Sequence, residues 1–402
     1  MVPLGSKQKR PPFEQSIMNI KGLLLASVVT ALSSIQLIGA TTAPSGPMRY
    51  TFYTTNTTAA SDARVSAIAG SAPTNSGVSG VYTFNHGNVS FTVSASSLPW
   101  HRVEHSAYGI DTLRTLMQSV TNYTFRSPLS DTNTVDSDLI TALQTQGSNN
   151  CIVLTNGVYY IGTNAVRMSA GSVLIGQDMS NVVVYGRGPA PDNSSGVIRI
   201  NDGCTVANLT GSTIPSPASP KNYTKAFEFF GGGYANDVTN TAYIINTLSF
   251  SDSDTIRGGG KVQVLNSCVH GKWDGFFLES LTVTNPALIY NCYGFCDDTS
   301  LNPDILLADV HALRLTGLKV DVWYSDFVAT DNVLGNGSVA AAIEPICTAN
   351  FYNCSFTPGT NGAANDGDFA VEIGSGANCT ITGGTYDPAK ISNHGNLSKM
   401  PP

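Results

Sequence analysis

Four segments in the second half of the chain resemble one another and recur at intervals typical of a repeated structural unit. Each is a short β-prone run that ends in Asn and Cys, at residues 262–268, 287–292, 349–354 and, more weakly, 376–379. Residues 318–325 have the same shape, with Ser325 in place of the cysteine. The steps from residue 268 through 292, 325 and 354 to 379 are 24, 33, 29 and 25 residues. A repeat of this length with short strands and polar turns predicts a solenoid.

Each coil of a solenoid buries its apolar side by stacking on its neighbours, at about 4.8 Å per rung. The expected inward-facing column consists of Val264, Ile289, Val320 and Phe351. The expected turn positions are Asn266, Asn291, Asn353 and Asn378. Asparagine suits such turns because it tolerates a left-handed backbone and its amide can bond the next rung. The alternative fold is an antiparallel β-sandwich, but sandwiches have shorter strand spacing and lack this column.

The eight cysteines are expected to be small core residues rather than a disulfide framework. Four of them fall at equivalent places in successive repeats: Cys268, Cys292, Cys354 and Cys379. Stacked equivalents of this kind point inward as buried thiols. If disulfides form instead, the best candidate pairs are Cys292 with Cys296 and Cys347 with Cys354. No paired CxxC motifs are present, so a structural zinc site is not expected.

Residues 1–45 are expected to form a leader and a hydrophobic segment. Met18 to Lys21 precedes an uncharged run at 22–40 that ends in small residues suited to a signal peptidase. A retained membrane anchor or assembly arm is the other interpretation, since about 19 residues suffice to span a bilayer. Membrane contact is expected only through 22–40. Ten N-x-S/T sequons favour an exported glycoprotein.

Residues 46–135 are predicted to form a β-rich cap with a short helix. Residues 50–53, 81–84 and 89–93 alternate with the period of two that is typical of strands, and 111–120 has apolar residues at helical spacing. Residues 136–402 are predicted to form the solenoid and a C-terminal tail. A second short helix, capped by Ser137 or Asp138, opens this part of the chain.

Three stretches at the start of the solenoid resemble the opening of pectin-lyase-like right-handed parallel β-helices. A short capping helix at 138–143 precedes a hydrophobic-Gly-Tyr-hydrophobic pair at 153–161 and a Val-rich step that ends in Gly186-Arg187-Gly188. The resemblance covers roughly residues 136–386. It implies an all-β fold, a right-handed parallel β-helix. It implies little about chemistry, because that superfamily includes lyases, hydrolases, isomerases and viral spikes.

Composition excludes nucleic acid as a partner. Charged residues make up only 12 % of the chain, the formal net charge is −7, and no cluster of Lys and Arg follows the N-terminal tail. Gly, Ser, Thr and Asn stand in place of the charged residues. A neutral surface rich in hydroxyls and amides is typical of extracellular β-proteins that bind glycans.

Acidic and aromatic residues are concentrated in the repeats. The candidate catalytic residues are Asp274, Asp297, Asp298 and Asp326, and the candidate sugar-stacking residues are Trp273, Tyr293, Trp323 and Tyr324. Equivalent carboxylates would lie about 5 Å apart on adjacent rungs and about 10 Å apart two rungs away. Glycosidases use a pair of carboxyl groups at separations in this range. The competing interpretation is that these aspartates cap turns.

The catalytic motifs of known β-helix enzymes are incomplete. The pair Asp297-Asp298 is similar to that of polygalacturonase-type hydrolases, but the only His-Gly step in this part of the helix, His270-Gly271, precedes it and no Arg-x-Lys follows. Arg257 and Arg314 lack the surroundings of a pectate-lyase arginine. Residues 101–105 match the zinc-protease pattern H-x-x-E-H, without a protease scaffold. We expect no metal and no cofactor.

The interpretation ranked first is therefore a glycan-contacting surface protein, such as a virion spike, fibre or decoration protein or an envelope component. Its expected location is extracellular or on a virion or cell surface. Its expected partners are glycans or neighbouring copies in a homo-oligomer. The alternative is a secreted polysaccharide hydrolase or lyase that uses aspartates on neighbouring coils.

Overall fold

The computed structural model describes residues 48–54, 74–75, 81–86, 89–95 and 107–400, the last range with gaps at 164, 178, 180, 187–194, 214–222, 232–236, 252, 281–285, 298–308, 331–336 and 360–366. No helix within these ranges is long and apolar enough to cross a membrane. The predicted hydrophobic segment at 22–40 and the zinc-protease pattern at 101–105 lie outside the described residues.

Three parallel sheets form the body of the molecule. Sheet 1 contains β5 (Asn122–Arg126), β6 (Asn150–Leu154), β9 (Val173–Gly176), β12 (Thr205–Ala207), β15 (Val238–Ile245), β18 (Gly260–Leu265), β21 (Ala287–Tyr290), β24 (Lys319–Trp323), β27 (Thr348–Tyr352), β30 (Asn378–Thr382) and β32 (Asn396–Met400). Sheet 2 contains β7 (Gly157–Tyr160), β10 (Val182–Gly186), β13 (Thr210–Thr213), β16 (Leu248–Ser251), β19 (Cys268–Gly271), β22 (Tyr293–Asp297), β25 (Asp326–Thr330) and β28 (Ser355–Thr357). Sheet 3 contains β8 (Val166–Arg167), β11 (Gly196–Ile200), β14 (Lys225–Phe229), β17 (Ile256–Gly258), β20 (Asp274–Glu279), β23 (Val310–Thr316), β26 (Ser338–Ile343), β29 (Phe369–Ile373) and β31 (Ile391–Asn393).

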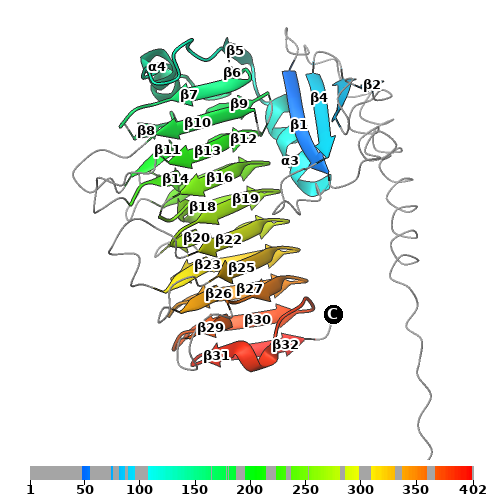
Figure 1. The fold of residues 1–402 in the computed structure, drawn as a ribbon, viewed down its shortest axis with the longest axis vertical. Coiled ribbons are helices and arrows are strands. Elements are labelled where there is room, and N and C mark those ends of the chain that lie inside the picture. Colours follow the sequence, from blue (N-terminus) through cyan, green and yellow to red (C-terminus); the bar gives the residue numbers. More distant parts are fainter. Residues whose placement is uncertain are drawn as a thin grey trace, which may run out of the picture.

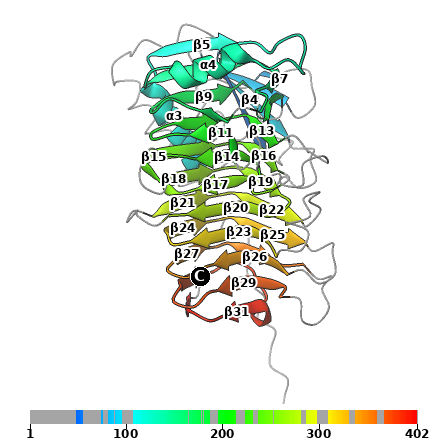
Figure 2. The same cartoon turned by 90° about the vertical axis from the view of Figure 1, so that its left-hand side faces the viewer.

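The chain visits the sheets in a fixed order. From β6 to β30 it passes from sheet 1 to sheet 2 to sheet 3 and back, so that each of the strands β6 to β27 pairs with the strand three places later in the sequence. Figures 1 and 2 show the resulting column of stacked rungs. The predicted fold class, a right-handed parallel β-helix, is confirmed.

The interior is filled by aligned apolar columns. In sheet 1 the paired residues Val264, Ile289, Val322 and Phe351 are all fully buried. The prediction that Val320 belongs to this column is wrong: it is buried in the adjacent inward column. Because side chains alternate with a period of two, a shift by two residues keeps the same face and changes only the column.

Asparagines occupy the turn from sheet 1 to sheet 2, as predicted for Asn266, Asn291 and Asn353, whose φ angles are 49°, 53° and 52°. The amide Nδ2 of Asn291 donates to Oδ1 of Asn266 over 3.0 Å, so the side chains link adjacent rungs. The prediction for Asn378 is wrong. This residue begins β30, and Gly383, with a φ of 66°, follows that strand at the turn.

All eight cysteines are buried free thiols, which confirms their prediction as core residues rather than disulfide partners. Only Cys292 and Cys354 share one column, with Ser325 between them. The predicted alignment of Cys268 and Cys379 with them is wrong. Cys268 pairs with Tyr293, one position later, because Ser267 separates it from the turn asparagine, and Cys379 is the partner of an alanine in mid-strand.

One short helix covers the first rung of the β-helix, at its N-terminal end. In α4 (Ser137–Thr145) the N-cap is Asp136, not Ser137 or Asp138 as predicted, and its side chain accepts from the backbone N–H of Leu139 over 2.8 Å. Leu139 and Leu143 are fully buried against the end of the β-helix. A short 3₁₀ helix, η3 (Pro388–Lys390), precedes β31.

The helix α3 (Ala107–Gln118) lies on the outer face of sheet 1 (Figure 1). Leu113 and Met117 pack there against outward residues such as Ile175 and Leu265. β5 is the first strand of sheet 1, so the β-helix begins within the range predicted for the cap. A separate sheet with the order β1-β4-β3-β2 is formed by β1 (Met48–Thr54), β2 (Thr74–Asn75), β3 (Val81–His86) and β4 (Val89–Ala95).

Candidate functional site

The predicted catalytic aspartates lie at two different corners of the β-helix. Asp274 begins β20 at the turn from sheet 2 to sheet 3 and is fully buried. Asp297 ends β22 at the same turn, one rung away, but its side chain and all of Asp298 lie outside what the structure describes. Asp326 begins β25 at the turn from sheet 1 to sheet 2, where it accepts a hydrogen bond from Ser355. The structure therefore separates Asp326 from Asp274.

The predicted aromatic residues also fall into separate places. Trp273 immediately precedes Asp274, and its ring centroid lies 6.1 Å from that of Tyr223. Tyr293 lies on sheet 2, where it packs against Leu248 and Cys268. Trp323 and Tyr324 lie where sheet 1 turns toward sheet 2. Trp273, next to β20 of sheet 3, is therefore separated from Trp323 and Tyr324 at the end of β24.

Trp323 and Tyr324 belong to a set that we call the aromatic row. Its members are Tyr108, Tyr290, Trp323, Tyr324 and Tyr352. Tyr290, Trp323 and Tyr352 are aligned partners on β21, β24 and β27. The residue before each of them is fully buried, and side chains alternate along a strand, so these three rings lie on the outer face. The Trp323 and Tyr352 rings are stacked with centroids 3.8 Å apart. Tyr324 and Tyr108, 49 % and 44 % exposed, flank the stack.

Polar groups lie beside the aromatic row. Asp321 and Asn350 precede Trp323 and Tyr352 by two residues, so they share the outer face of sheet 1. The Asn350 amide Nδ2 donates to Oδ1 of Asp321 over 2.8 Å. This surface therefore combines aromatic faces with carboxylate and amide groups.

A charged cluster on sheet 3 surrounds Asp274. Its Oδ1 lies 2.7 Å from Nδ1 of His311, its aligned partner on β23. Its Oδ2 lies 3.7 Å from Nη1 of Arg314. On the preceding rung Asp254 is fully buried, and its Oδ2 lies 3.2 Å from Nη1 of Arg257. Burial, and then the negative charge of Asp274, raise the pKa of Asp254 to about 6.

The sequence did not identify Asp254 and His311 as members of this cluster. His311 was missed because it follows Asp274 by 37 residues, more than any of the repeat steps read from the sequence, although the two residues are aligned. The outermost carboxylates are Glu279 and Glu344, whose side chains are 43 % and 30 % exposed. Among the described residues no group of three or more His, Cys, Asp or Glu side chains is arranged to hold a metal ion.

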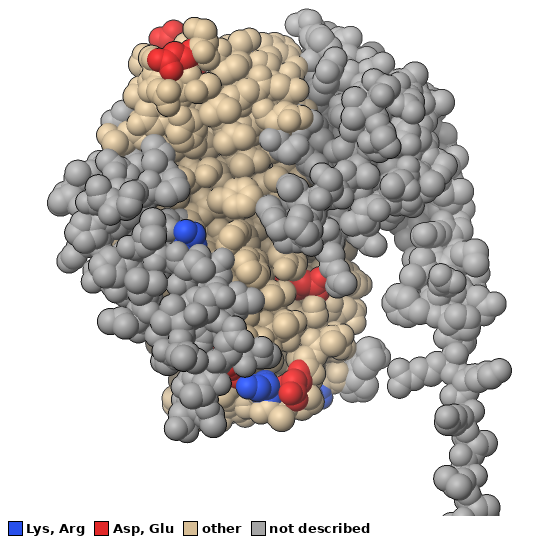
Figure 3. Space-filling model, in the orientation of Figure 1, with Lys and Arg blue, Asp and Glu red and all other residues tan. Residues whose placement is uncertain are grey.

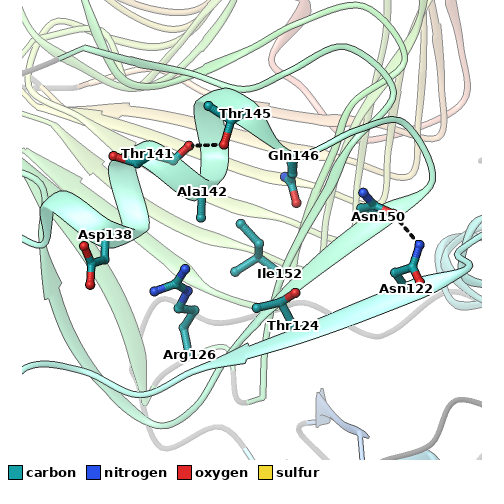
Figure 4. Close-up of a pocket in the computed structure, with 10 residues that line it drawn as sticks. All are labelled: Asn122, Thr124, Arg126, Asp138, Thr141, Ala142, Thr145, Gln146, Asn150 and Ile152. Carbon is teal, nitrogen blue, oxygen red and sulfur yellow. Dashed lines mark hydrogen bonds between the residues drawn. The ribbon is translucent and has the colours of Figure 1, made fainter.

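A polar groove of about 590 Å³ lies between α4, β5 and β6 (Figure 4). Arg126, Asp138 and Gln146 line it, and Ile152 forms part of its floor. The Arg126 Nε and both amide atoms of Gln146 are buried and have no hydrogen-bond partner in the part of the chain that the structure describes. None of the predicted site residues lines this groove.

Charged side chains are sparse on the face seen in Figure 1. Figure 3 shows that most of its described surface is neither acidic nor basic. This agrees with the low charge content of the chain, in which charged residues make up 12 %.

No protein-family profile and no curated protein matches the chain. Three solved structures are similar at low identity. The A-module of the mannuronan C-5 epimerase AlgE4 from Azotobacter vinelandii is 12 % identical, with a TM-score of 0.36 over 69 % of this chain and 95 % of that one. The pectin methylesterase of Aspergillus niger is 10 % identical, with a TM-score of 0.30 over 70 % and 85 %.

The third similar structure is the ORF18 protein of Geobacillus virus E2. It is 11 % identical, with a TM-score of 0.33 over 81 % of this chain and 68 % of that chain. The three continuous parallel sheets of its own structure identify the chain as a right-handed parallel β-helix.

Proposed function

We propose that this chain is a glycan-contacting surface protein, and that the aromatic row on sheet 1 is its glycan-binding surface. The observation that carries the proposal is the alignment of Tyr290, Trp323 and Tyr352 on adjacent strands of an outer face. Two rung steps extend the row by about 10 Å along the axis of the β-helix. Because Trp323 and Tyr352 are stacked on each other, a sugar chain lying along this axis would contact the outer edges of this pair and stack an apolar ring face on the exposed ring of Tyr324.

The neighbouring polar groups support the same ligand class. Asp321 and Asn350 supply acceptors and amide donors for sugar hydroxyls next to the aromatic surface. Partly exposed aromatic residues in a contiguous set mark an interaction surface more often than isolated ones do. Export, a position on a virion or cell surface and homo-oligomer formation are parts of the same proposal that rest on the sequence.

A purely structural role for the aromatic row is the competing explanation, since stacked rings also stabilise adjacent rungs. Tyr324→Asn distinguishes the two. Tyr324 has a φ of 50°, at a turn position where other rungs carry asparagine. The substitution therefore removes an exposed ring and leaves a residue that suits the backbone.

The test is a titration of the full chain with neutral and acidic oligosaccharides, in which tryptophan fluorescence measures binding. We expect saturable binding that Tyr324→Asn weakens by roughly threefold to tenfold without lowering the melting temperature. Phe125→Ala, which removes another exposed ring from β5 of the same sheet, is the matched control and should bind normally. Equal affinity of the wild type and Tyr324→Asn would rule out the aromatic row as the binding surface.

A further inference from the structure

One column of outward-facing side chains on sheet 3 is charged or polar on some rungs and apolar on others. Asp254, Asp274 and His311 occupy aligned positions on three successive rungs. The next two positions of the same column hold Val339 and Phe369. Because apolar residues fill the column on those rungs, packing of the β-helix does not require charged residues in it.

The carboxylates of this column are costly to the folded state. Asp254 and Asp274 are both fully buried, and Oδ1 of Asp254 and Oδ2 of Asp274 have no hydrogen-bond partner among the described residues, although Oδ2 of Asp274 lies 3.7 Å from Nη1 of Arg314. A buried polar atom without a partner destabilises a protein, and a buried charge does so more strongly. A cluster that only stabilised the rungs would provide hydrogen-bond partners for these oxygen atoms. The presence of two such carboxylates therefore points to a chemical role.

His311 is the member of the column that reaches the surface. Its side chain is 12 % exposed, and Nδ1 lies 2.7 Å from the carboxylate of Asp274. A carboxylate only accepts, so in the neutral imidazole Nδ1 carries the proton and Nε2 is the acceptor nitrogen. Nε2 has no hydrogen-bond partner among the described residues. An imidazole held in one tautomer by a buried carboxylate is the arrangement of a general base.

The residues around His311 limit the class of reaction that it could catalyse. Glycoside hydrolysis needs two carboxyl groups that reach the substrate. Asp254 and Asp274 are sealed from the surface, and the partly exposed Glu279 and Glu344 are held in ion pairs with Arg257 and Arg314. Arg314 is not available to clamp a free carboxylate of a substrate, since its Nε and Nη2 contact Glu344. Its Nη1, 3.7 Å from Asp274 and not hydrogen-bonded to it, remains as a donor beside His311. The carbonyl of Trp273 accepts from the His311 backbone N–H over 3.0 Å, which fixes the strand of His311 beside Asp274.

We propose that His311, positioned by Asp274, is a general base that activates water to hydrolyse an acyl ester carried by a glycan. The glycan as carrier rests on the proposed function, whereas the His311–Asp274 pair does not. Nε2 takes a proton from water as the water oxygen bonds to the acyl carbon and the carbonyl electron pair moves to its oxygen, beside Arg314 Nη1. The intermediate then expels the sugar oxygen, which takes the proton from Nε2, and the products are a carboxylic acid and a free hydroxyl.

The test uses the full chain with two substrates, p-nitrophenyl acetate and an O-acetylated polysaccharide, and measures nitrophenol and acetate release. We expect His311→Gln to lower both rates by about 100-fold or more and Asp274→Asn to lower them by roughly 10-fold or more. His311→Val, which copies the residue that follows in the column, should be folded and equally inactive. His394→Gln, an exposed histidine near the C-terminal end, is the matched control and should keep the wild-type rates.

The two substrates separate this proposal from the glycan-binding proposal. Loss of polysaccharide deacetylation in Tyr324→Asn, with normal hydrolysis of p-nitrophenyl acetate, supports both proposals together. His311-dependent hydrolysis of both substrates with no effect of Tyr324→Asn supports the general base and contradicts the aromatic row. Hydrolysis of neither substrate above the level of a folded His311→Val protein would overturn the assignment of His311.

Discussion

The turn from sheet 1 to sheet 2 requires one residue per rung in the left-handed region of the backbone. Asparagine meets this requirement at Asn208, Asn246, Asn266, Asn291 and Asn353, with φ between 49° and 55°. Its side chain adds a second contribution, because the Asn246 amide also donates to Asn208 over 2.6 Å. The conformation explains why asparagine, and not the cysteine beside it, sets the register of the repeat.

Asn291 tests this account. Asn291→Ala removes both the tolerance for φ of 53° and the hydrogen bond to Asn266. We expect a loss of about 1 to 3 kcal/mol in the free energy of unfolding, measured by denaturant titration. Asn291→Gly keeps the backbone freedom and loses only the hydrogen bond, so it should lose less. A glycine variant less stable than the alanine variant would contradict the conformational explanation.

The raised pKa of Asp254 predicts how the stability of the fold depends on pH. The charges that face it are those of Lys225, Arg257, Arg314 and Asp274, and burial outweighs the cations, so its pKa is raised to about 6. A carboxyl whose pKa is higher in the folded state than in the unfolded state stabilises the fold while it is protonated. Its contribution is therefore present below about pH 4 and lost as the pH rises through 6.

Asp254→Asn should remove this dependence. We expect the variant to gain stability relative to the wild type between pH 4 and pH 8, by on the order of 2 kcal/mol, offset in part by the lost contact with Arg257. Melting temperatures of both proteins across this range measure the effect. A difference between them that stays constant from pH 4 to pH 8 would show that Asp254 is ionised at the lower pH.

At the scale of elements, the short helix α4 seals the apolar end of the β-helix. Leu139 and Leu143 point from it into the core cluster, while Thr141 is exposed. We expect Leu143→Ala to cost about 2–5 kcal/mol of unfolding free energy, because it leaves a cavity over the first rung. Thr141→Ala on the exposed face of the same helix is the control and should change stability by less than about 1 kcal/mol. Similar losses in both variants would mean that α4 does not seal the core.

An element could be predicted well where its sequence signal lies within a few neighbouring residues. The strand runs and the capping helix follow from the alternation and spacing of nearby residues, and their existence was predicted from sequence. The columns depend on alignment across 20 to 40 residues. The pairing of Cys268 with Tyr293 shows how one additional residue after Asn266 changes a column. The proximity of His311 to Asp274 depends on the number of residues between β20 and β23, which the repeat pattern of the sequence does not fix.

At the scale of the whole molecule, a β-helix is a one-dimensional stack in which each rung contacts only its neighbours. Phe276 lies near the middle of the stack, fully buried, with its ring centroid 6.1 Å from that of Phe327. We expect Phe276→Ala to cost about 3–5 kcal/mol locally, because the cavity lies at the contact between adjacent rungs. In a linear stack this loss weakens the coupling between the two halves, so they should unfold in separate transitions.

Hydrogen exchange followed by mass spectrometry reports this coupling rung by rung. In Phe276→Ala, protection should fall most in β17, β20 and β23 and least in β9 and β30, which are several rungs away in either direction. Ile381→Ala, a buried residue of sheet 1 close to the C-terminal end, is the matched control. It should loosen only the last rungs, because they have neighbours on one side only. A uniform rise in exchange along all three sheets in Phe276→Ala would instead show that the stack unfolds as one cooperative unit.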